Sequence, residues 1–552
     1  MPQALELAKE HHKNGRSVEA QAIYQQILAV DPNYFDAMHL LGVLMDETHP
    51  DDLGVLLIRK ALTLQPDNDY ALQNLGYILM KRGDLQSAIQ LLNRAVEIKP
   101  DYFRAYNNLA LAYEKTKQFE LAEATYRQAL KVQPDFPDTM NNLANALMEL
   151  KKFDEALVVY RRASELMPAD AEILSNVGNA LKKLRQYDEA ETIHRRALAM
   201  NPDSPPVLNN LASVMEVLKR ADEAERLYRR AIEVRPDYGP AHWNLSSILL
   251  RRGDLIEGFK EFEWRDLWTG VDSSRKFPKP TWDGSNLRGK RILVHAEQGL
   301  GDSLQFIRFI PQVVSRGGVV IVEIQPALRQ LLSNYPGISE IVSYGEALPE
   351  YDVQIKLTSL PLALGTTLEN CNPRSPYLHA PADAIERWRN RLAEFSDRKL
   401  NVGLAWAGNP QHFKDFNRSI KLSTYAPLAA VTGVRFFSLQ KGPAGDQAAN
   451  PPAGMELIDW TAELTDFTET AGLVQNLDLL ISIDSAIVHL SGAMAKPAWV
   501  LIANLPDWRW LLNVSESPWY PTVRLYRQIR ECDWSDPIAA IATDLASLAN
   551  RG

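Results

Sequence analysis

An acidic side chain stands where a short apolar run gives way to a helical pattern. Ile292–Val294 leads to the turn Gly299–Asp302, and apolar residues then recur at helical spacing. A carboxylate here can act as a general base on a hydroxyl group, because α/β proteins bind ligands at the carboxyl edge of the sheet. It can also simply cap the helix, since a helix N-terminus attracts negative charge. His295 and Glu297 are alternative bases nearby.

A second set of residues has the chemistry of an anion site. Asp484 and Ser485 follow an apolar run and begin a helix, whose first N–H groups and positive dipole end attract anions. His489 lies one helical turn later on the same face. With Arg418 and Lys441, which follow two other apolar runs, this helix start could neutralise a diphosphate leaving group without a metal. The alternative is a capped core helix with a buried histidine and ordinary surface cations.

Other residues are expected to border a bound donor, although packing explains them equally well: Gly301, Trp406, Asn409, His412 and Thr470. The aromatic stretch 507–528 predicts either a platform beside the donor or the closing core of a lobe. Dinucleotide, phosphate-loop, nucleophile-elbow and zinc motifs are absent from the sequence, so neither a metal nor another cofactor is expected.

The composition limits the classes of partner and compartment. A net charge of -9 argues against a general nucleic-acid-binding protein. Only two cysteines occur, Cys371 and Cys532, which excludes a disulfide framework. Neither a signal-peptide pattern nor an apolar run of membrane-spanning length is present, so a soluble cytoplasmic protein is expected.

The elements of the first half follow a period of 34 residues. Prolines mark it at positions 32, 66, 100, 134, 168, 202 and 236. This period is typical of tetratricopeptide repeats, each a pair of antiparallel helices. About seven repeats are predicted over 1–237, closed by a helix pair over 241–265.

One column of the repeats could bind a polypeptide. The first helix of six repeats carries an asparagine, at Asn74, Asn108, Asn142, Asn176, Asn210 and Asn244. An amide both donates and accepts, so a ladder of amides on the concave surface could pair with a peptide backbone of loosely defined sequence. Alternatively, each asparagine bonds the neighbouring helix.

The second half alternates apolar strands with amphipathic helices after a linker rich in Pro, Gly and Ser. This pattern predicts two parallel sheets with both faces covered, and a ligand cleft between the two lobes.

Two motifs of this half resemble those of the GT-B glycosyltransferases, in particular the heptosyltransferase-like group. The segment EQGLGDSLQFIRFIP is similar to the opening turn of that family, and IDSAIVHLSGAMAKPAWVLI to its second-lobe segment. Ala486 stands where the family usually has glycine. The resemblance implies that Asp302 is the base and that Arg418 contacts the diphosphate. The asparagine column resembles that of the O-GlcNAc transferases.

The expected fold is therefore an α-solenoid superhelix of tetratricopeptide repeats (1–268), a linker (269–288), and a GT-B fold of two Rossmann-like α/β lobes (289–398 and 399–552). The expected function is metal-independent, inverting transfer of a sugar from a nucleotide-sugar to a Ser or Thr hydroxyl of a protein held by the repeats. Two alternatives remain: a repeat scaffold with a degenerate second half, or an enzyme acting on glycan acceptors.

Overall fold

The computed structural model describes residues 1–48, 52–267, 275, 277–371, 375–395, 397, 399–411 and 415–550. These residues form two compact units, Met1–Val234 and Arg235–Gly552.

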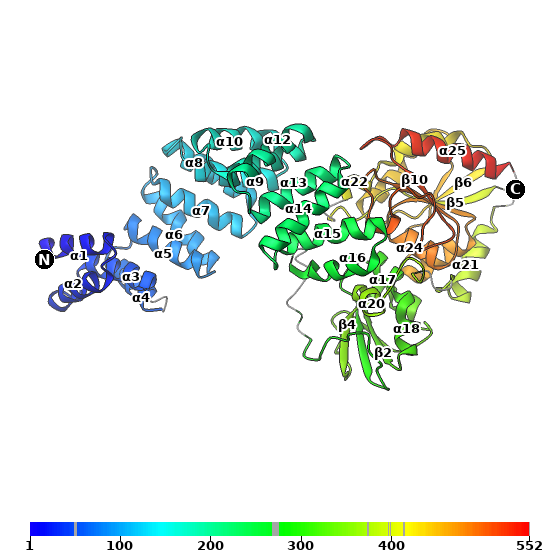
Figure 1. The fold of residues 1–552 in the computed structure, drawn as a ribbon, viewed down its shortest axis with the longest axis horizontal. Coiled ribbons are helices and arrows are strands. Elements are labelled where there is room, and N and C mark those ends of the chain that lie inside the picture. Colours follow the sequence, from blue (N-terminus) through cyan, green and yellow to red (C-terminus); the bar gives the residue numbers. More distant parts are fainter. Residues whose placement is uncertain are drawn as a thin grey trace. The chain divides into compact units, whose positions relative to one another are not determined.

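The first unit consists of helix pairs (Figure 1), and its described residues form fourteen α-helices. They are α1 (Pro2–Lys13), α2 (Ser17–Val30), α3 (Phe35–Thr48), α4 (Asp52–Leu64), α5 (Asp69–Lys81), α6 (Leu85–Ile98), α7 (Phe103–Lys115), α8 (Phe119–Val132), α9 (Pro137–Glu149), α10 (Phe153–Leu166), α11 (Ala171–Lys183), α12 (Tyr187–Met200), α13 (Pro205–Val217) and α14 (Ala221–Val234). The prediction of a helical repeat is confirmed.

The turn inside each pair repeats as regularly as the helices. Its residue adopts a left-handed conformation with φ between 59° and 62° at Lys117, Lys151, Arg185 and Lys219, and glycine takes the same place at Gly15 and Gly83. Small residues let the two helices of a pair approach closely. A Cβ atom on Gly178 would lie 2.6 Å from the ring of His194, for example.

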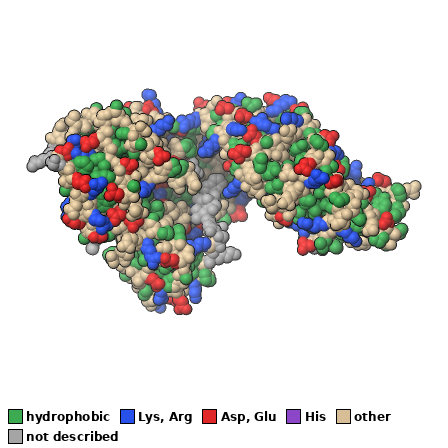
Figure 2. Space-filling view, turned by 180° about the vertical axis from the view of Figure 1, so that it is seen from behind, with side chains coloured by type: hydrophobic (Ala, Val, Ile, Leu, Met, Phe, Trp, Pro, Cys, Tyr) green, Lys and Arg blue, Asp and Glu red, His purple; other side chains and the backbone are tan. Residues whose placement is uncertain are grey.

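Ion pairs join successive repeats on the surface at the same period: Arg127–Glu155 (2.7 Å), Arg161–Glu189 (2.6 Å) and Arg195–Glu223 (2.6 Å). Acidic and basic side chains are accordingly mixed over the face shown in Figure 2. Exposed pairs of this kind contribute little stability, roughly 0.2–1 kcal/mol each.

The second unit opens with the last helix pair, α15 (Gly239–Arg252) and α16 (Leu255–Phe262), and the short 3-10 helix η1 (Glu263–Leu267). Phe259 on α16 packs edge-on against Phe306 and Trp508, with ring centroids 6.4 and 5.4 Å away. This pair is therefore part of the second unit, whereas the sequence placed the end of the repeat domain at residue 268.

The first sheet has four parallel strands in the order β3-β2-β1-β4. They are β1 (Arg291–His295), β2 (Val319–Ile324), β3 (Ile338–Ser343) and β4 (Val353–Lys356). The helical segments around them are α17 (Leu300–Phe306), η2 (Ile307–Phe309), α18 (Ile310–Ser315), α19 (Pro326–Leu332), η3 (Leu357–Ser359) and α20 (Leu360–Ala363).

The two faces of this sheet are covered differently. Helical residues pack on Ile292, Val294 and their neighbours. The opposite face, with Leu293, Ile321 and Val342, is covered by the loop residues Phe277, Leu348 and Tyr351. Both faces are therefore covered, as predicted, although the described connection from β3 to β4 (344–352) supplies loop residues instead of a helix.

The second sheet has six parallel strands in the order β10-β9-β8-β5-β6-β7. They are β5 (Leu400–Ala405), β6 (Val434–Ser438), β7 (Leu457–Asp459), β8 (Leu479–Ile483), β9 (Ala498–Ile502) and β10 (Val523–Arg527). The helical segments are α21 (Ala382–Leu392), α22 (Asp415–Arg418), η4 (Leu422–Ala430), η5 (Pro443–Ala449), α23 (Phe467–Asn476), α24 (Ala486–Ala493), η6 (Trp508–Trp510) and α25 (Ser535–Ala549). Two parallel α/β sheets are thus present, as predicted. In the part of the chain that the structure describes, we find no helix with the length and apolar character that crossing a membrane requires.

Candidate functional site

The second sheet places its ligand crevice by topology. Its first strand, β5, lies in the middle of the sheet. The chain adds β6 and β7 on one side of β5 and then returns to add β8, β9 and β10 on the other side, so the order reverses between β5 and β8. Doubly wound sheets bind ligands beyond the carboxyl ends of the strands at such a point. The turn after β5 leads to Arg418, and the turn after β8 holds Asp484 and Ser485, so both lie at this edge.

A glycine in the turn after β5 leaves room for Arg418 to lie close to that turn. Its Nε donates to Asp415 Oδ1 at 3.3 Å, and the Ser419 hydroxyl donates to Asp415 Oδ2 at 2.7 Å. A Cβ atom on Gly408 would lie 2.9 Å from Arg418 Nη2. The sequence therefore allows the guanidinium to lie directly against the backbone.

Asp484 lies in an unusual electrostatic environment. Burial raises its pKa to about 6, the neighbouring Asp507 adds to the rise, and Arg418 opposes it. Ser485 is the N-cap residue of α24, and no side-chain cap bond is found for it. The first N–H groups of this helix therefore remain available to an anion.

His489 joins the two lobes. Its Nδ1 lies 2.9 Å from the Tyr520 hydroxyl, and its ring stacks on Trp510 with centroids 5.6 Å apart. A Cβ atom on Gly301 would lie 2.8 Å from this ring, so Gly301 permits α17 to approach α24. Burial, with Arg509 adding to it, lowers the pKa of His489 well below its ordinary value, so the ring is neutral.

Asp302 caps the turn and also contacts the second lobe. Its Oδ2 accepts the Gly299 N–H at 2.9 Å, which is a capping contact. Its Oδ1 accepts a hydrogen bond from Arg509 of the second lobe. About a quarter of its side chain, 24%, remains exposed, so the carboxylate is still accessible.

Arg509 is the main residue that sequence reasoning missed. It lies inside the aromatic stretch 507–528, where only packing or stacking was considered. Besides Asp302, its side chain donates to Asp507 Oδ1 at 2.9 Å and to Gln305 Oε1 at 2.5 Å. An arginine beside an acid two positions earlier was the available signal.

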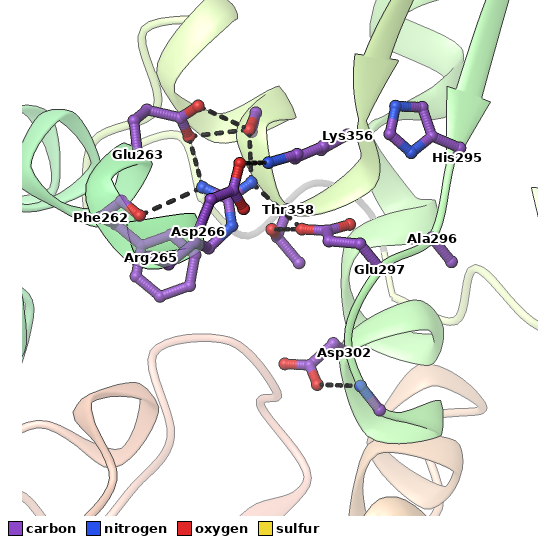
Figure 3. A network of polar contacts seen from close by, with 12 residues as sticks. Phe262, Glu263, Arg265, Asp266, His295, Ala296, Glu297, Asp302, Lys356 and Thr358 are labelled. Atoms are coloured by element: carbon purple, nitrogen blue, oxygen red, sulfur yellow. Dashed lines mark hydrogen bonds and ion pairs between the residues drawn. The ribbon is translucent and has the colours of Figure 1, made fainter. Parts of the chain in front are cut away.

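Other residues engage both alternative bases, and Figure 3 shows the contacts of Glu297. The Glu297 side chain is 8% exposed and accepts from Thr358 and, at 3.1 Å, from the fully buried Arg265. His295 bonds Gln354 at 2.9 Å, and burial lowers its pKa to about 4. Of the three base candidates at this turn, Asp302 therefore has the most exposed side chain.

Arg265 shows how the last helix pair supports the same turn. From η1 it also donates to the Ser359 hydroxyl at 2.7 Å and pairs with Glu263 at 2.8 Å (Figure 3). It thus ties η1 to the residues that follow β1 and β4.

The remaining predicted donor residues each bond a backbone group. Lys441 donates to the Thr461 carbonyl at 2.6 Å. Thr470 bonds the Asp466 carbonyl at 2.8 Å, and Asn409 caps the turn at Gln411.

The expectation that Trp406 borders the donor is wrong, because its side chain is completely buried and cannot stack on a ligand. His412 lies outside the described residues. Gln440, which the sequence did not suggest, fixes the backbone after β5 by accepting from the N–H groups of residues 406 and 407 at 2.9 and 2.8 Å. The aromatic stretch 507–528 forms the closing core of the lobe, which was one of its two interpretations, because its large side chains are buried: Trp508, Trp510, Trp519 and Tyr520.

The asparagine column is partly used within the repeats. Three members donate to the preceding repeat: Asn74 to His39 Nε2 (3.0 Å), Asn176 to Asn141 Oδ1 (3.0 Å) and Asn210 to Ser175 Oγ (3.1 Å). Asn108 and Asn142 are half-buried, and no hydrogen bond from their side chains to another described residue is found. The column therefore joins repeats at some positions and leaves amides available at others.

A protein holds a metal ion with a cluster of His, Cys, Asp or Glu side chains. Among the described residues, no group of three or more His, Cys, Asp or Glu side chains could hold a metal ion.

Known proteins match the first part of the chain. Models described as TPR repeat or tetratricopeptide repeat match residues 57–90, 76–117, 103–136, 135–203 and 181–249. Together with the helix pairs, these matches make the first part a tetratricopeptide-repeat array, a class of fold that offers extended surfaces to protein partners.

Individual proteins give weaker likenesses. Protein FlbA of Caulobacter vibrioides is 25% identical over 325 residues, which are 55% of this chain and 54% of FlbA, so the chain spans about half the length of this curated relative. The solved structure of YrrB, described as a TPR protein with an unusual peptide-binding site, is 21% identical, with 33% of this chain and 95% of YrrB covered at a TM-score of 0.30. PilF of Pseudomonas aeruginosa is 21% identical, with 38% of this chain and 96% of PilF covered at a TM-score of 0.36.

Proposed function

We propose that the chain is an inverting glycosyltransferase of GT-B fold that moves a sugar from a nucleotide-sugar to a hydroxyl of a protein. The observation that carries this proposal is the contact of the Asp302 turn with the second lobe: Arg509 donates to Asp302, and Gly301 approaches Ala486 at the start of α24, next to Asp484, whose pKa Arg418 influences. This contact supports the proposal, because sugar transfer needs an acid close to groups that can bind the departing diphosphate.

The reaction divides between these groups. The acceptor oxygen attacks the anomeric carbon while Asp302 takes the hydroxyl proton, and the bond from that carbon to the phosphate oxygen breaks. The diphosphate departs with the electron pair. Arg418 and the N–H groups at Ser485 stabilise its developing charge. A single displacement of this kind inverts the anomeric centre.

The repeats supply the protein acceptor in this proposal. Asn108 and Asn142 offer amides that can pair with an extended backbone, and the other half of the amide column keeps the repeats in register.

The first experiment is thermal unfolding of the full chain with UDP, GDP, CMP, ADP and dTDP, without added metal. A ligand at about 100 times its dissociation constant adds roughly 2.7 kcal/mol to the free energy of unfolding. We expect one nucleotide to raise the melting temperature and Arg418→Ala to abolish the effect. Asp302→Asn should then reduce sugar transfer by about 10²–10⁴-fold while the nucleotide still binds.

If none of these nucleotides stabilises the folded chain, the protein is instead a repeat scaffold that binds protein partners without transferring a sugar.

A further inference from the structure

The guanidinium of Arg509 is shared between the two lobes. One nitrogen donates to Asp302 of the first lobe, and a second donates to Asp507 of its own lobe at 2.9 Å. The side chain is 10% exposed and lies over the Trp508 ring, 4.3 Å from its centroid. Arg509 is therefore a buried cation whose position is fixed by an aromatic ring.

The same cation lies beside the expected diphosphate position. Its partner Asp302 follows Gly301, on which a Cβ atom would lie 3.4 Å from Ala486 Cα, so the Arg509–Asp302 pair lies next to the start of α24. Trp510, the next residue along, stacks directly on His489. A diphosphate at this helix start would be within reach of the Arg509 fork.

A diphosphate and Asp302 would compete for the same N–H groups. Guanidinium matches phosphate and carboxylate oxygens in the same bidentate geometry, and a diphosphate carries the greater negative charge. The Arg509–Asp302 pair is thus one of two alternative partnerships of this guanidinium. While it persists, both oxygens of the base are engaged, one by Arg509 and one by the Gly299 N–H.

We propose that Arg509 is a positioning residue that exchanges Asp302 for the diphosphate of the donor. Donor binding then turns the guanidinium toward the phosphates and releases Asp302 Oδ1 for the acceptor hydroxyl. No covalent bond changes in this exchange, because only hydrogen bonds are redistributed. This inference rests on the proposed function, and it adds a coupling: the base becomes available only when a donor is present.

The test measures the affinity of the full chain for inorganic diphosphate and for UDP, GDP, ADP and dTDP by titration calorimetry. Asp302→Asn is nearly isosteric and removes the competing charge, so it should bind the diphosphate ligand about three- to tenfold more tightly than the unmodified chain. Arg509→Met should bind it at least about tenfold more weakly, and Arg509→Lys should restore part of the loss. The gain from Asp302→Asn should vanish in the Asp302→Asn/Arg509→Met double variant.

The matched control is Asp544→Asn, which breaks the 2.8 Å ion pair with Arg524 in the same lobe and should leave the affinity unchanged. If the diphosphate ligand binds and depends on Arg418 but is indifferent to Asp302→Asn and Arg509→Met, the exchange is wrong and the proposed function stands. If neither inorganic diphosphate nor any nucleotide binds the unmodified chain, both are wrong.

Discussion

Gly408 determines how closely Arg418 can approach the turn after β5. Because a Cβ atom there would meet the guanidinium and the Asp415 carboxylate, Gly408→Ala should displace Arg418 while the rest of the lobe stays folded. We expect nucleotide affinity to fall at least about tenfold, as the loss of one charge-assisted pair implies. Calorimetric titration measures this loss.

Arg418→Ala sets the scale for that experiment. If Gly408 acts only through Arg418, the double variant binds no more weakly than Arg418→Ala alone. Additive losses would show that Gly408 contacts the nucleotide itself.

Asp484 should make the second unit less stable at high pH. Its pKa is about 6 in the folded chain and near 3.8 when unfolded, so the folded state holds more protons between these values. Stability from this group is present in full below pH 3.8 and is lost as pH rises through about 6. Asp484→Asn should therefore raise the melting temperature by roughly a few degrees at pH 8, and the gain should shrink as pH falls toward 4.5. A gain that is independent of pH would contradict this account.

The residues of the site were predictable to different degrees. Asp302, Asp484 and His489 follow from position, because they stand at strand ends or one helical turn later. Arg509 and Gln440 act through partners distant in sequence, at Asp302 and at the turn after β5, which a local pattern does not identify; the acid two positions before Arg509 was its one local signal. Trp406 was misplaced because a strand end can direct a side chain either into the crevice or into the core.

At the scale of elements, the amide column should separate into two functions. Asn108→Ala with Asn142→Ala removes amides that bond no described neighbour, so it should weaken binding to extended peptides while the urea midpoint stays the same. Asn176→Ala with Asn210→Ala removes two bonds between repeats and should lower stability by about 0.5–1.5 kcal/mol for each. Binding to a library of unstructured peptides and urea unfolding measure the two effects.

If Asn108→Ala with Asn142→Ala lowers stability and leaves peptide binding unchanged, the whole asparagine column has a structural role only.

The elements themselves were predicted where a strong period or a long apolar run exists. The 34-residue period predicts all the helix pairs, and buried apolar runs mark seven of the ten described strands. The other three lack such a run: β3 (Ile338–Ser343) is half exposed and carries Glu340, β7 spans only three residues, and β10 contains two arginines. The prediction that both faces of the first sheet are covered is confirmed. One face is covered by loop residues, because the chain crosses from β3 to β4 by a loop instead of the helix that a parallel crossover usually contains.

At the scale of the whole molecule, the division into units differs from the predicted domains. The helix pair α15–α16 continues the repeat pattern in sequence, but its apolar side chains pack on Phe306 and Trp508 of the second unit. Sequence period reports local helix pairing, whereas the unit to which a pair belongs depends on contacts with residues far along the chain.

The distribution of tryptophan allows the two units to be followed separately. All twelve tryptophans lie in residues 235–552, and residues 1–234 contain none. Tryptophan fluorescence therefore reports unfolding of the second unit, whereas far-UV circular dichroism is sensitive to the helices of both. If the donor binds at the start of α24, a stabilising nucleotide should shift the fluorescence-detected transition by the amount that its affinity requires. After this transition is subtracted, the remaining dichroism transition reports the first unit, and its midpoint should stay the same. A nucleotide that shifts only the dichroism transition would place its binding site on the repeats and would contradict a donor site in the second unit.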